Sequence, residues 1–466
     1  MENCKMKMIY GIKDKPPVKQ MLMFALQQLL AIIAATILVP ILVNAFGEKN
    51  LQMDPAAALF GAGVGTLVYY FFTRGKSPVF LGSSFAFLNS MYAATAFGYL
   101  GILFGAIFAG LVYVIVALII KAVGAGWINK LLPPVIIGPT IALIGLSLAG
   151  SAVNNLNNTA SSPDNYNLLH ILCGLFAFAV VIYCAAKGSK FLSLIPFVIG
   201  VGAGYALAWV FTVFGIIFER DYLIIVNYQS IVDCFVPFGF ESIFRMPDFA
   251  FINAIKEFGN FEWRALGKIA LLYAPVAFVV MAEHIGDHKN LSSVLSTEEE
   301  PVDLLTDPGL DNTLLGDGVG TVVGALFGGC PNTTYGESVG CVAITKNASV
   351  VTILTTAFGA LLLSFFSPFV ALINSLPSCI VGGICLALYG FIAVSGLKMI
   401  QKVNLEDSRN LFVVSSILIT GIGGLTLNFG EYVTITTTAT ALAIGILVNL
   451  MMQKLPPMKG REEDDE

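Results

Sequence analysis

Charged residues are scarce in this chain. Only 12% of its 466 residues are Asp, Glu, Lys or Arg, whereas 56% are hydrophobic and the mean hydropathy is +0.82. A soluble domain carries about 25% charged residues, so the composition excludes a soluble globular protein and predicts a polytopic membrane protein. The net charge of −5 comes largely from acidic loops and the tail Glu462–Glu466. It indicates no nucleic-acid partner.

Metal and disulfide patterns are also missing. The eight cysteines form no Cys-x-x-Cys pair, and none of the three histidines accompanies them at the spacing of metal ligands. Most of the cysteines lie in apolar segments, where a cysteine behaves as a small apolar residue. Because no nucleophile–base pair is present either, we expect no cofactor and no enzymatic activity.

What the sequence does contain is long apolar runs, about fourteen of them, each a candidate membrane span. They lie at 21–44, 55–73, 79–95, 98–121, 131–153, 167–186, 191–218, 265–286, 314–329, 331–346, 349–374, 378–397, 409–428 and 432–453. The first run is longer than a signal-peptide core and lacks a clear cleavage site, so we expect it to be retained. The basic clusters alternate consistently with a cytoplasmic N-terminus. We predict a cell-membrane protein with both termini in the cytoplasm.

Two pairs of segments indicate an internal repeat. Leu132–Gly138 resembles Leu376–Gly382, and Ser83–Phe87 resembles Thr333–Glu337, at offsets of 244 and 250 residues. Chance similarity of short segments is the alternative. Two halves of seven spans each would be inverted relative to one another, and inverted repeats place a binding site near the membrane midplane.

Spans 3 and 10 carry the signals of interrupted helices. Pro78–Gly82 and Pro331–Thr334 are short and contain Pro, Gly or Thr, which favours an extended strand that leads into a half-helix. Irregular backbone at membrane depth persists only where it is buried in protein or lines a cavity. The half-helix N-termini offer N–H groups to a carbonyl oxygen or an anion.

Two carboxylates lie in the same parts of the chain. Glu283 ends a long apolar run, and Glu337 follows the Pro331–Thr334 segment. An ionisable side chain at membrane depth costs about 2.5–3.5 kcal/mol on insertion scales and usually has a function, although a carboxylate near a helix end can also reach water. Together with the half-helix N–H groups, the two carboxylates match a flat ligand with N–H and C=O groups, such as a pyrimidine or purine.

Other ionisable residues are ambiguous. Asp287 either belongs to the site or lies exposed at a cytoplasmic helix end. We expect His284 to be structural and His288 to be solvated. Asp317 either supports the site from span 9 or begins a helix. An intramembrane aspartyl protease would need a second catalytic Asp in an apolar span, and we find none.

The motifs resemble the nucleobase–cation symporter-2 family (nucleobase/ascorbate transporters), and within it the uracil permease branch. Pro-Asn-Thr-Thr-Tyr-Gly-Glu is typical of that branch. The segments that carry the resemblance are Leu26–Gln28, Ala34–Pro40, Phe80–Phe87, Ala282–Gly286, Asp307–Leu310, Pro331–Glu337 and Ala343–Thr345.

The resemblance implies an all-α fold of fourteen spans as 7+7 inverted repeats, with short antiparallel strands and half-helices in spans 3 and 10. It also implies a core domain and a gate domain. The core domain would comprise residues 20–130 (spans 1–4) and 264–374 (spans 8–11). The gate domain would comprise 131–219 (spans 5–7) and 375–455 (spans 12–14).

The resemblance also implies a set of substrate contacts. Glu283 and Glu337 would accept hydrogen bonds from ring N–H groups. The backbone of Phe85, Tyr335 and Gly336 would meet the carbonyls. Ala35 and the rings of Phe85 and Tyr335 would pack on the base. Uracil permeases usually carry His four residues after the span-8 Glu, whereas this chain has Asp287 there. The family's usual hydrogen-bond network between Glu and His is therefore in question. Asp287 joins the candidate proton-coupling network.

These features predict a secondary-active uracil importer, coupled to protons by Glu283, Glu337 and Asp287 and working by alternating access. A carboxylate that faces a low-dielectric cavity binds a proton more readily than one in water. Sodium is the alternative coupling ion, and xanthine or another purine the alternative substrate. From another class, an anion transporter or a channel on the same fold remains open. The resemblance further implies a homodimer in the lipid bilayer.

Overall fold

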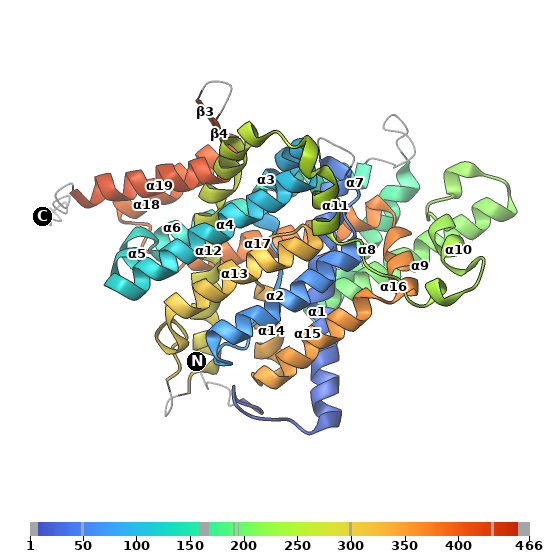
Figure 1. Ribbon diagram of the computed structural model, residues 1–466, viewed down its shortest axis with the longest axis horizontal. Coiled ribbons are helices and arrows are strands. Elements are labelled where there is room, and N and C mark those ends of the chain that lie inside the picture. The colour runs from blue at the N-terminus through green and yellow to red at the C-terminus, as the bar shows by residue number, and fades with distance from the viewer. Residues whose placement is uncertain are drawn as a thin grey trace, which may run out of the picture.

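The computed structural model consists mostly of helices (Figure 1). It describes residues 8–47, 51–157, 167–189, 192–193, 195–297, 301–429 and 433–454. Eight helices in these ranges are long and apolar enough to cross a membrane, and three shorter apolar helices accompany them. The acidic tail Glu462–Glu466 lies outside the described residues.

The first half of the chain follows the predicted spans, and span 3 is interrupted. Its elements are α1 (Val18–Phe46), α2 (Pro55–Thr73), β1 (Leu81–Ser83), η1 (Phe85–Phe87), α3 (Leu88–Ala94), η2 (Thr95–Phe97), α4 (Gly98–Val123), α5 (Gly126–Leu131), α6 (Pro134–Ser147), α7 (Ala149–Asn157), α8 (Leu168–Lys187) and α9 (Pro196–Ile217).

The second half repeats this order, with span 10 interrupted in the same way. Its elements are α12 (Leu266–Leu295), η7 (Leu305–Gly309), α13 (Leu310–Gly328), β2 (Asn332–Thr334), α14 (Gly336–Thr345), α15 (Val350–Ser364), α16 (Ser367–Asn374), α17 (Ser378–Ile400), α18 (Ser408–Ile422), β3 (Leu427–Phe429), β4 (Val433–Ile435) and α19 (Thr437–Lys454).

The connection between the halves contains short helices and turns that were not predicted from the sequence. It lies between α9 and α12 and includes two short helices and several 3₁₀ turns. They are η3 (Asp221–Leu223), α10 (Gln229–Phe235), η4 (Phe240–Ser242), α11 (Ala250–Glu257), η5 (Phe258–Asn260) and η6 (Trp263–Ala265).

The two interrupted spans meet through their strands. β1 pairs antiparallel with β2, with Leu81 opposite Thr334, Gly82 opposite Thr333 and Ser83 opposite Asn332. The Ser84 N–H donates to the Pro331 carbonyl at 2.9 Å, just beyond the pairing. The predicted strands and half-helices of spans 3 and 10 are therefore confirmed, and a half-helix continues from each strand.

The hairpin β3–β4 was not predicted. The apolar runs at 409–428 and 432–453 predicted helix up to 428 and again from 432, but α18 ends at Ile422 and α19 begins at Thr437. Leu427 pairs with Ile435 in the hairpin between them. The residues involved include Val433-Thr-Ile-Thr, and β-branched side chains favour strands over helices. High hydropathy alone did not distinguish this hairpin from the ends of two spans.

Close contacts through glycine join the helices of one packed group, in which α4, α13, α2 and α15 run side by side (Figure 1). A Cβ atom on Gly61 of α2 would lie 2.3 Å from the Gly324 carbonyl oxygen of α13. A Cβ on Gly110 of α4 would lie 2.6 Å from the Gly318 carbonyl oxygen. Small residues let transmembrane helix backbones approach in this way, and dispersion contacts then stabilise the pair.

We expect Gly61→Ala to destabilise the protein. The added methyl group would have to displace the backbone of α13, and overpacking of this kind costs about 1–3 kcal/mol. Thermal unfolding of the purified protein in detergent measures the effect. Gly202→Ala in α9 is the control, since a Cβ there meets nothing within 4 Å. An unchanged melting temperature in Gly61→Ala would contradict this account of the helix packing.

A second set of helices packs around α17. Gly396 of α17 approaches α6, where an added Cβ would lie 2.2 Å from the Ala142 nitrogen. A Cβ added to Gly383 would lie 2.0 Å from the Gly174 carbonyl oxygen of α8. α18 contacts both α19 and α6. The assignment of 20–130 with 264–374 to a core domain, and of 131–219 with 375–455 to a gate domain, stays a prediction.

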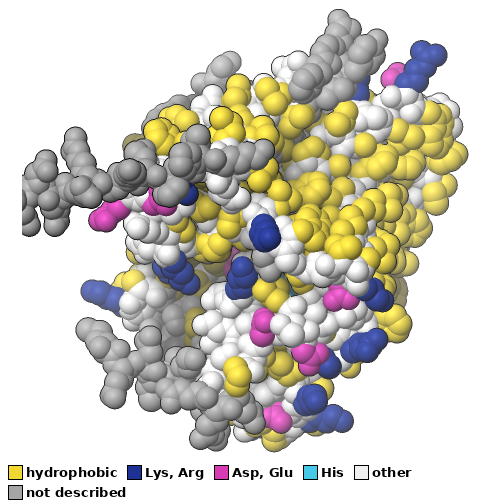
Figure 2. All heavy atoms as spheres, turned by 90° about the vertical axis from the view of Figure 1, so that its left-hand side faces the viewer, with side chains coloured by type: hydrophobic (Ala, Val, Ile, Leu, Met, Phe, Trp, Pro, Cys, Tyr) yellow, Lys and Arg dark blue, Asp and Glu magenta, His cyan; other side chains and the backbone are white. Residues whose placement is uncertain are grey.

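The surface of the protein is divided between apolar and charged areas. Figure 2 shows hydrophobic side chains over a broad part of one face, with Lys, Arg, Asp and Glu over another part. Large exposed hydrophobic side chains on α8 and α9 include Leu172, Leu175, Phe176, Val210, Phe214 and Ile217. A lipid environment accommodates such a surface, as expected of a multi-pass membrane protein.

Candidate functional site

A cavity of about 260 Å³ lies where the two interrupted spans meet α12. Its polar side is formed by α12, by the residues after β1, and by β2 with the start of α14. Its apolar side comes from α6, α9 and α17. The lining residues are Ser84, Phe85, Ala86, Ile141, Ile144, Phe197, Glu283, Asp287, Asn290, Thr333, Tyr335, Gly336, Glu337, Phe391, Ile392 and Ser395.

Three carboxylates line this cavity, and no Lys, Arg or His is among the lining residues. Glu283 and Asp287 are one helical turn apart on α12, so both project from the same face. Glu337 lies in the first turn of α14, where the helix dipole favours a negative charge. The result is a small cavity rich in hydrogen-bond acceptors.

Asp287 has a fixed partner in the wall of the cavity. Its Oδ2 accepts a hydrogen bond from the Thr334 hydroxyl at 3.0 Å, which ties α12 to β2. Asp287 lines the cavity and is not exposed at a helix end, so that second interpretation was wrong, whereas its part in a binding site stays a prediction. The helix continues to Leu295, well past the predicted end at 286, and keeps this carboxylate inside the protein.

The half-helix N-termini also reach the cavity, through Phe85 and Gly336. N–H groups in the first turn of a helix have no carbonyl one turn earlier to bond, so they are free for a ligand. The Tyr335 N–H differs, because it donates to the Phe80 carbonyl at 3.3 Å. Of the three backbone donors that the resemblance implied, Tyr335 is thus already engaged in the structure.

Aromatic rings frame the cavity. The Phe85 ring lies edge-on to Tyr389 of α17, with centroids 5.8 Å apart. The Tyr335 ring is buried and its hydroxyl donates to the Ser83 carbonyl at 2.8 Å, which holds the two interrupted spans together. Ala35 is buried in α1 and is not among the lining residues, so its packing on a bound base stays a prediction.

Two polar lining residues were not predicted from the sequence. Asn290 lies three residues after Asp287 on α12, and Ser395 belongs to α17. The Ser84 hydroxyl is buried and has no hydrogen-bond partner among the described residues, which leaves it available to a ligand or a water molecule. Ser84 and Thr333 were visible in the sequence as members of the repeated small-residue motif, but that motif did not show which side chains face the cavity.

Gln28 supports the site from behind. Its side-chain amide donates to the Ser338 hydroxyl at 2.6 Å, and this hydroxyl accepts the Phe80 N–H at 3.0 Å. The contacts join α1, the segment before β1 and the first turn of α14. Gln28 thereby helps to hold Glu337 in place, because Ser338 is the next residue along the helix.

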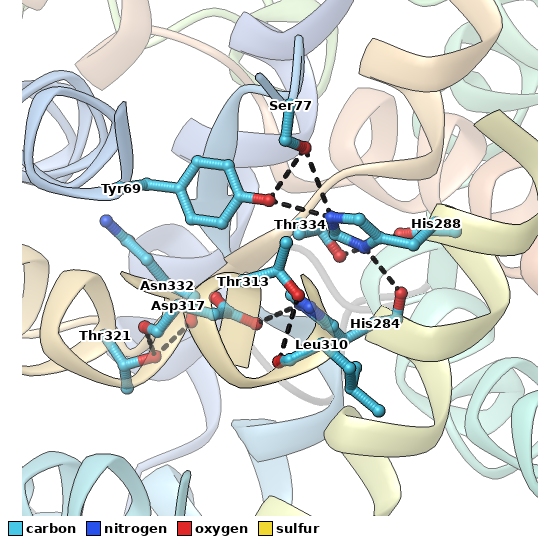
Figure 3. Close-up of polar contacts among 11 residues, drawn as sticks. Tyr69, Ser77, His284, His288, Leu310, Thr313, Asp317, Thr321, Asn332 and Thr334 are labelled. Atoms are coloured by element: carbon cyan, nitrogen blue, oxygen red, sulfur yellow. Dashed lines mark hydrogen bonds and ion pairs between the residues drawn. The ribbon is translucent and has the colours of Figure 1, made fainter. Parts of the chain in front are cut away.

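Two histidines of α12, His284 and His288, each follow a cavity carboxylate by one position, and Figure 3 shows their polar contacts. His284 is fully buried and its Nδ1 lies 2.8 Å from Asp317 Oδ2, also fully buried. Asp317 lies in the interior of α13 and not at its start, so the helix-start interpretation was wrong; that it supports the site stays a prediction. The expectation that His284 is structural agrees with its burial and its partner.

The expectation that His288 is solvated was wrong. Its side chain is fully buried, and its Nε2 lies 2.7 Å from the Tyr69 hydroxyl and 3.2 Å from the Ser77 hydroxyl (Figure 3). The physical reason is again the length of α12. Because the helix continues to Leu295, His288 lies inside the packed protein.

Comparison with known proteins assigns the family. Residues 19–429 match the profile of the Permease family. The chain is 38% identical to the uracil permease of Bacillus caldolyticus over 97% of this chain and 96% of that protein. It is 38% identical to the uracil permease of Bacillus subtilis (strain 168), over 99% and 98%. It is 33% identical to the uracil permease of Escherichia coli (strain K12), over 97% and 96%.

Solved structures with the same fold belong to more distant proteins. The transmembrane domain of the cyanobacterial bicarbonate transporter BicA aligns with a TM-score of 0.55 at 14% identity, covering 94% of this chain and all of that one. SLC26A9 aligns with a TM-score of 0.60 at 9% identity, covering 94% of this chain and 66% of that one. These similarities concern the fold alone, an all-α arrangement of 7+7 inverted repeats. By its full-length relatives and its family profile, the chain is a member of the permease family known as nucleobase–cation symporter-2.

Proposed function

We propose that this permease imports uracil together with protons by alternating access. The observation that supports the proposal best is the acidic cavity between the two half-helices. Carboxylates accept hydrogen bonds from the ring N–H groups of a nucleobase, and the N–H groups at the half-helix starts donate to its carbonyls. Full-length relatives at 33–38% identity that are named uracil permeases support the same substrate.

Proton coupling follows from the charge of the cavity. Uracil is neutral, so any charge that drives its transport has to be carried with it. Three ionised carboxylates close together in a low-dielectric site repel one another, and each carries a desolvation cost. A proton that binds with the substrate reduces both the repulsion and the desolvation cost. Its release on the other side of the membrane returns the carboxylates to their ionised state. Glu283, Glu337 and Asp287 are the candidate proton carriers.

The acidic lining also separates this proposal from an anion carrier. The solved structures with the same fold include a bicarbonate transporter and an anion transporter. A site for anions would need basic or neutral residues where Glu283, Asp287 and Glu337 line the cavity. A channel would need a continuous polar pathway, whereas the apolar side of this cavity is formed by Ile and Phe side chains.

The test is uptake of radiolabelled uracil into proteoliposomes under imposed ion gradients. We expect an inward proton gradient to drive accumulation, about tenfold per pH unit for one proton per uracil, because one unit corresponds to about 1.4 kcal/mol. A protonophore should abolish the accumulation. If a sodium gradient at equal pH drives accumulation and a proton gradient does not, sodium and not the proton is the coupling ion.

A purine is the second candidate substrate, and Asp287 is the observation that favours it. A third carboxylate beside Glu283 adds an acceptor that a uracil ring, with two N–H groups, does not need. Competition of labelled uracil uptake by unlabelled bases separates the two. We expect excess uracil to suppress the signal and xanthine to leave it unchanged. Suppression by xanthine at lower concentration than by uracil would favour the purine.

The assembly and orientation belong to the same proposal. We place the protein in the cell membrane with both termini in the cytoplasm, on the distribution of its basic loops. We also propose that it works as a homodimer and moves a core domain, formed by spans 1–4 and 8–11, against a gate domain. Cross-linking in native membranes tests the dimer, and labelling of cysteines introduced at each terminus from either side of the membrane tests the orientation.

A further inference from the structure

Helix α12 presents two different polar faces. Glu283 and Asp287 face the cavity, whereas His284 and His288 follow each of them by one position and are fully buried. Consecutive residues of an α-helix point about 100° apart. Each histidine therefore points away from the face of α12 that carries Glu283 and Asp287. The two imidazole rings stack with centroids 4.1 Å apart.

His284 attaches this buried side to α13, through its 2.8 Å contact with Asp317. His288 attaches it to α2 and to the segment before β1. Its Nε2 lies 2.7 Å from the Tyr69 hydroxyl, and the Ser77 hydroxyl lies 2.9 Å from the Tyr69 hydroxyl and 3.2 Å from the same ring nitrogen. Figure 3 shows these side chains converging from separate elements.

The chemistry of these contacts fixes the state of the ring. His288 Nδ1 lies 2.9 Å from the His284 carbonyl oxygen, which can only accept, so Nδ1 carries the hydrogen and donates it. In a neutral imidazole the other nitrogen is then an acceptor. Nε2 therefore accepts from the Tyr69 or the Ser77 hydroxyl. An oriented ring with both nitrogens engaged cannot rotate without losing a buried hydrogen bond.

We propose that His288, held by Tyr69 and Ser77, is a positioning residue that fixes the rotation of α12 and so keeps the Asp287 carboxylate turned into the cavity. The inference rests on the proposed function, because it concerns the geometry of that same site. It assigns a role to a side chain behind the cavity that touches no substrate.

A small rotation of α12 would displace the Asp287 carboxylate by more than a hydrogen bond tolerates. A carboxylate about 5–6 Å from the helix axis moves by about 2 Å when the helix turns by about 20°. Hydrogen bonds operate within a few tenths of an ångström of their preferred length. Such a turn would break the 3.0 Å contact between Asp287 and Thr334 and withdraw the carboxylate from a ligand.

Tyr69→Phe is the cleanest test, because it removes one hydroxyl and keeps the ring. A lost buried hydrogen bond of about 1 kcal/mol corresponds to about a fivefold change. We expect the KM for uracil to rise by that factor, with Vmax and membrane abundance nearly unchanged. His288→Leu should raise KM further, and His288→Gln should recover at least half of the loss, because its amide oxygen can still accept from the Tyr69 or the Ser77 hydroxyl. Tyr70→Phe is the matched control, since Tyr70 is the adjacent residue and is exposed.

Two further measurements separate positioning from a merely structural role. In an Asp287→Asn background, Tyr69→Phe should cause no additional rise in KM, because its effect acts through Asp287. In a second series, Asp287→Cys is labelled with a water-soluble thiol reagent, and adding Tyr69→Phe should slow the labelling. This series needs no transport, and the wild-type protein supplies the background from native cysteines.

The outcomes are distinct. A lower melting temperature with unchanged KM and unchanged labelling would overturn the inference, as would an equal rise in KM in the Asp287→Asn background. If the wild-type protein takes up neither uracil nor xanthine, the proposed function fails, and the labelling series still decides whether Tyr69 and His288 orient position 287.

Discussion

Glu283→Ala is expected to abolish nucleobase uptake while the protein remains in the membrane. The substitution removes an acceptor that faces the cavity from α12 and leaves a substrate N–H without a partner. A hydrogen bond to a charged group contributes about 1.5–3 kcal/mol, so binding alone should weaken about 10- to 100-fold. The loss of a proton carrier stops coupled transport in addition. Radiolabelled uptake, together with immunoblotting of the membrane fraction, measures both parts.

Glu406→Gln is the matched control for this substitution. Glu406 is an exposed carboxylate outside the cavity, so its neutralisation should leave uptake and abundance at wild-type levels. Glu283→Gln keeps the volume of the side chain and tests the charge separately. Wild-type uptake by Glu283→Ala would remove this residue from the mechanism and with it the proposed binding mode.

Glu337→Gln is expected to have an effect of the same size for a different reason. The amide keeps one acceptor oxygen but turns an NH₂ group toward a ligand whose N–H already points there, and two donors cannot pair. It also removes a negative charge that the N-terminus of α14 stabilises. We expect uptake to fall to background, with the protein still folded and inserted.

The contrast with Glu337→Asp makes this prediction specific. Aspartate keeps the charge and shortens the reach by one methylene group, so it should retain measurable uptake with a raised KM. Equilibrium binding of labelled uracil to the purified variants separates lost binding from lost coupling. Uptake by Glu337→Gln at the level of Glu337→Asp would show that the charge at this position is dispensable.

Much of the fold could be predicted because hydropathy and basic loops are strong, independent signals. Each apolar run from 21–44 to 432–453 overlaps helices or an interrupted span. The strands β1 and β2 were predictable because Pro78 and Pro331 stop a helix at a depth where irregular backbone requires a protein partner. The hairpin β3–β4 was missed because an apolar strand and the end of an apolar helix can have the same hydropathy.

The cavity residues were predictable to the extent that their motifs carry chemistry. The carboxylates of Glu283 and Glu337 are costly at membrane depth, and the structure brings both to one cavity with Asp287. Their roles in binding stay predictions. Ala35 was carried over from the resemblance alone, and nothing in its own chemistry could test that assignment from the sequence.

The side chains behind the cavity could not be predicted, because they depend on tertiary contacts. His288 and Asp317 are ordinary polar residues in sequence, and only the packing of α12 against α2 and α13 makes them buried partners. The predicted end at 286 is nine residues before the observed end at Leu295, and this error was enough to place His288 in water. Helix ends are the least certain part of a sequence reading, and here one of them decided the interpretation.

The antiparallel pairing of β1 with β2 has a consequence for how the protein is made. Residues 81–83 leave the ribosome long before residues 332–334, and the early strand has no partner until the later one is inserted in the opposite sense. A nascent chain that stops after α9 carries β1 without β2, so the backbone N–H and C=O groups of β1 lack their strand partner. A separately produced first half should therefore recover activity only when the second half is supplied in the same membrane.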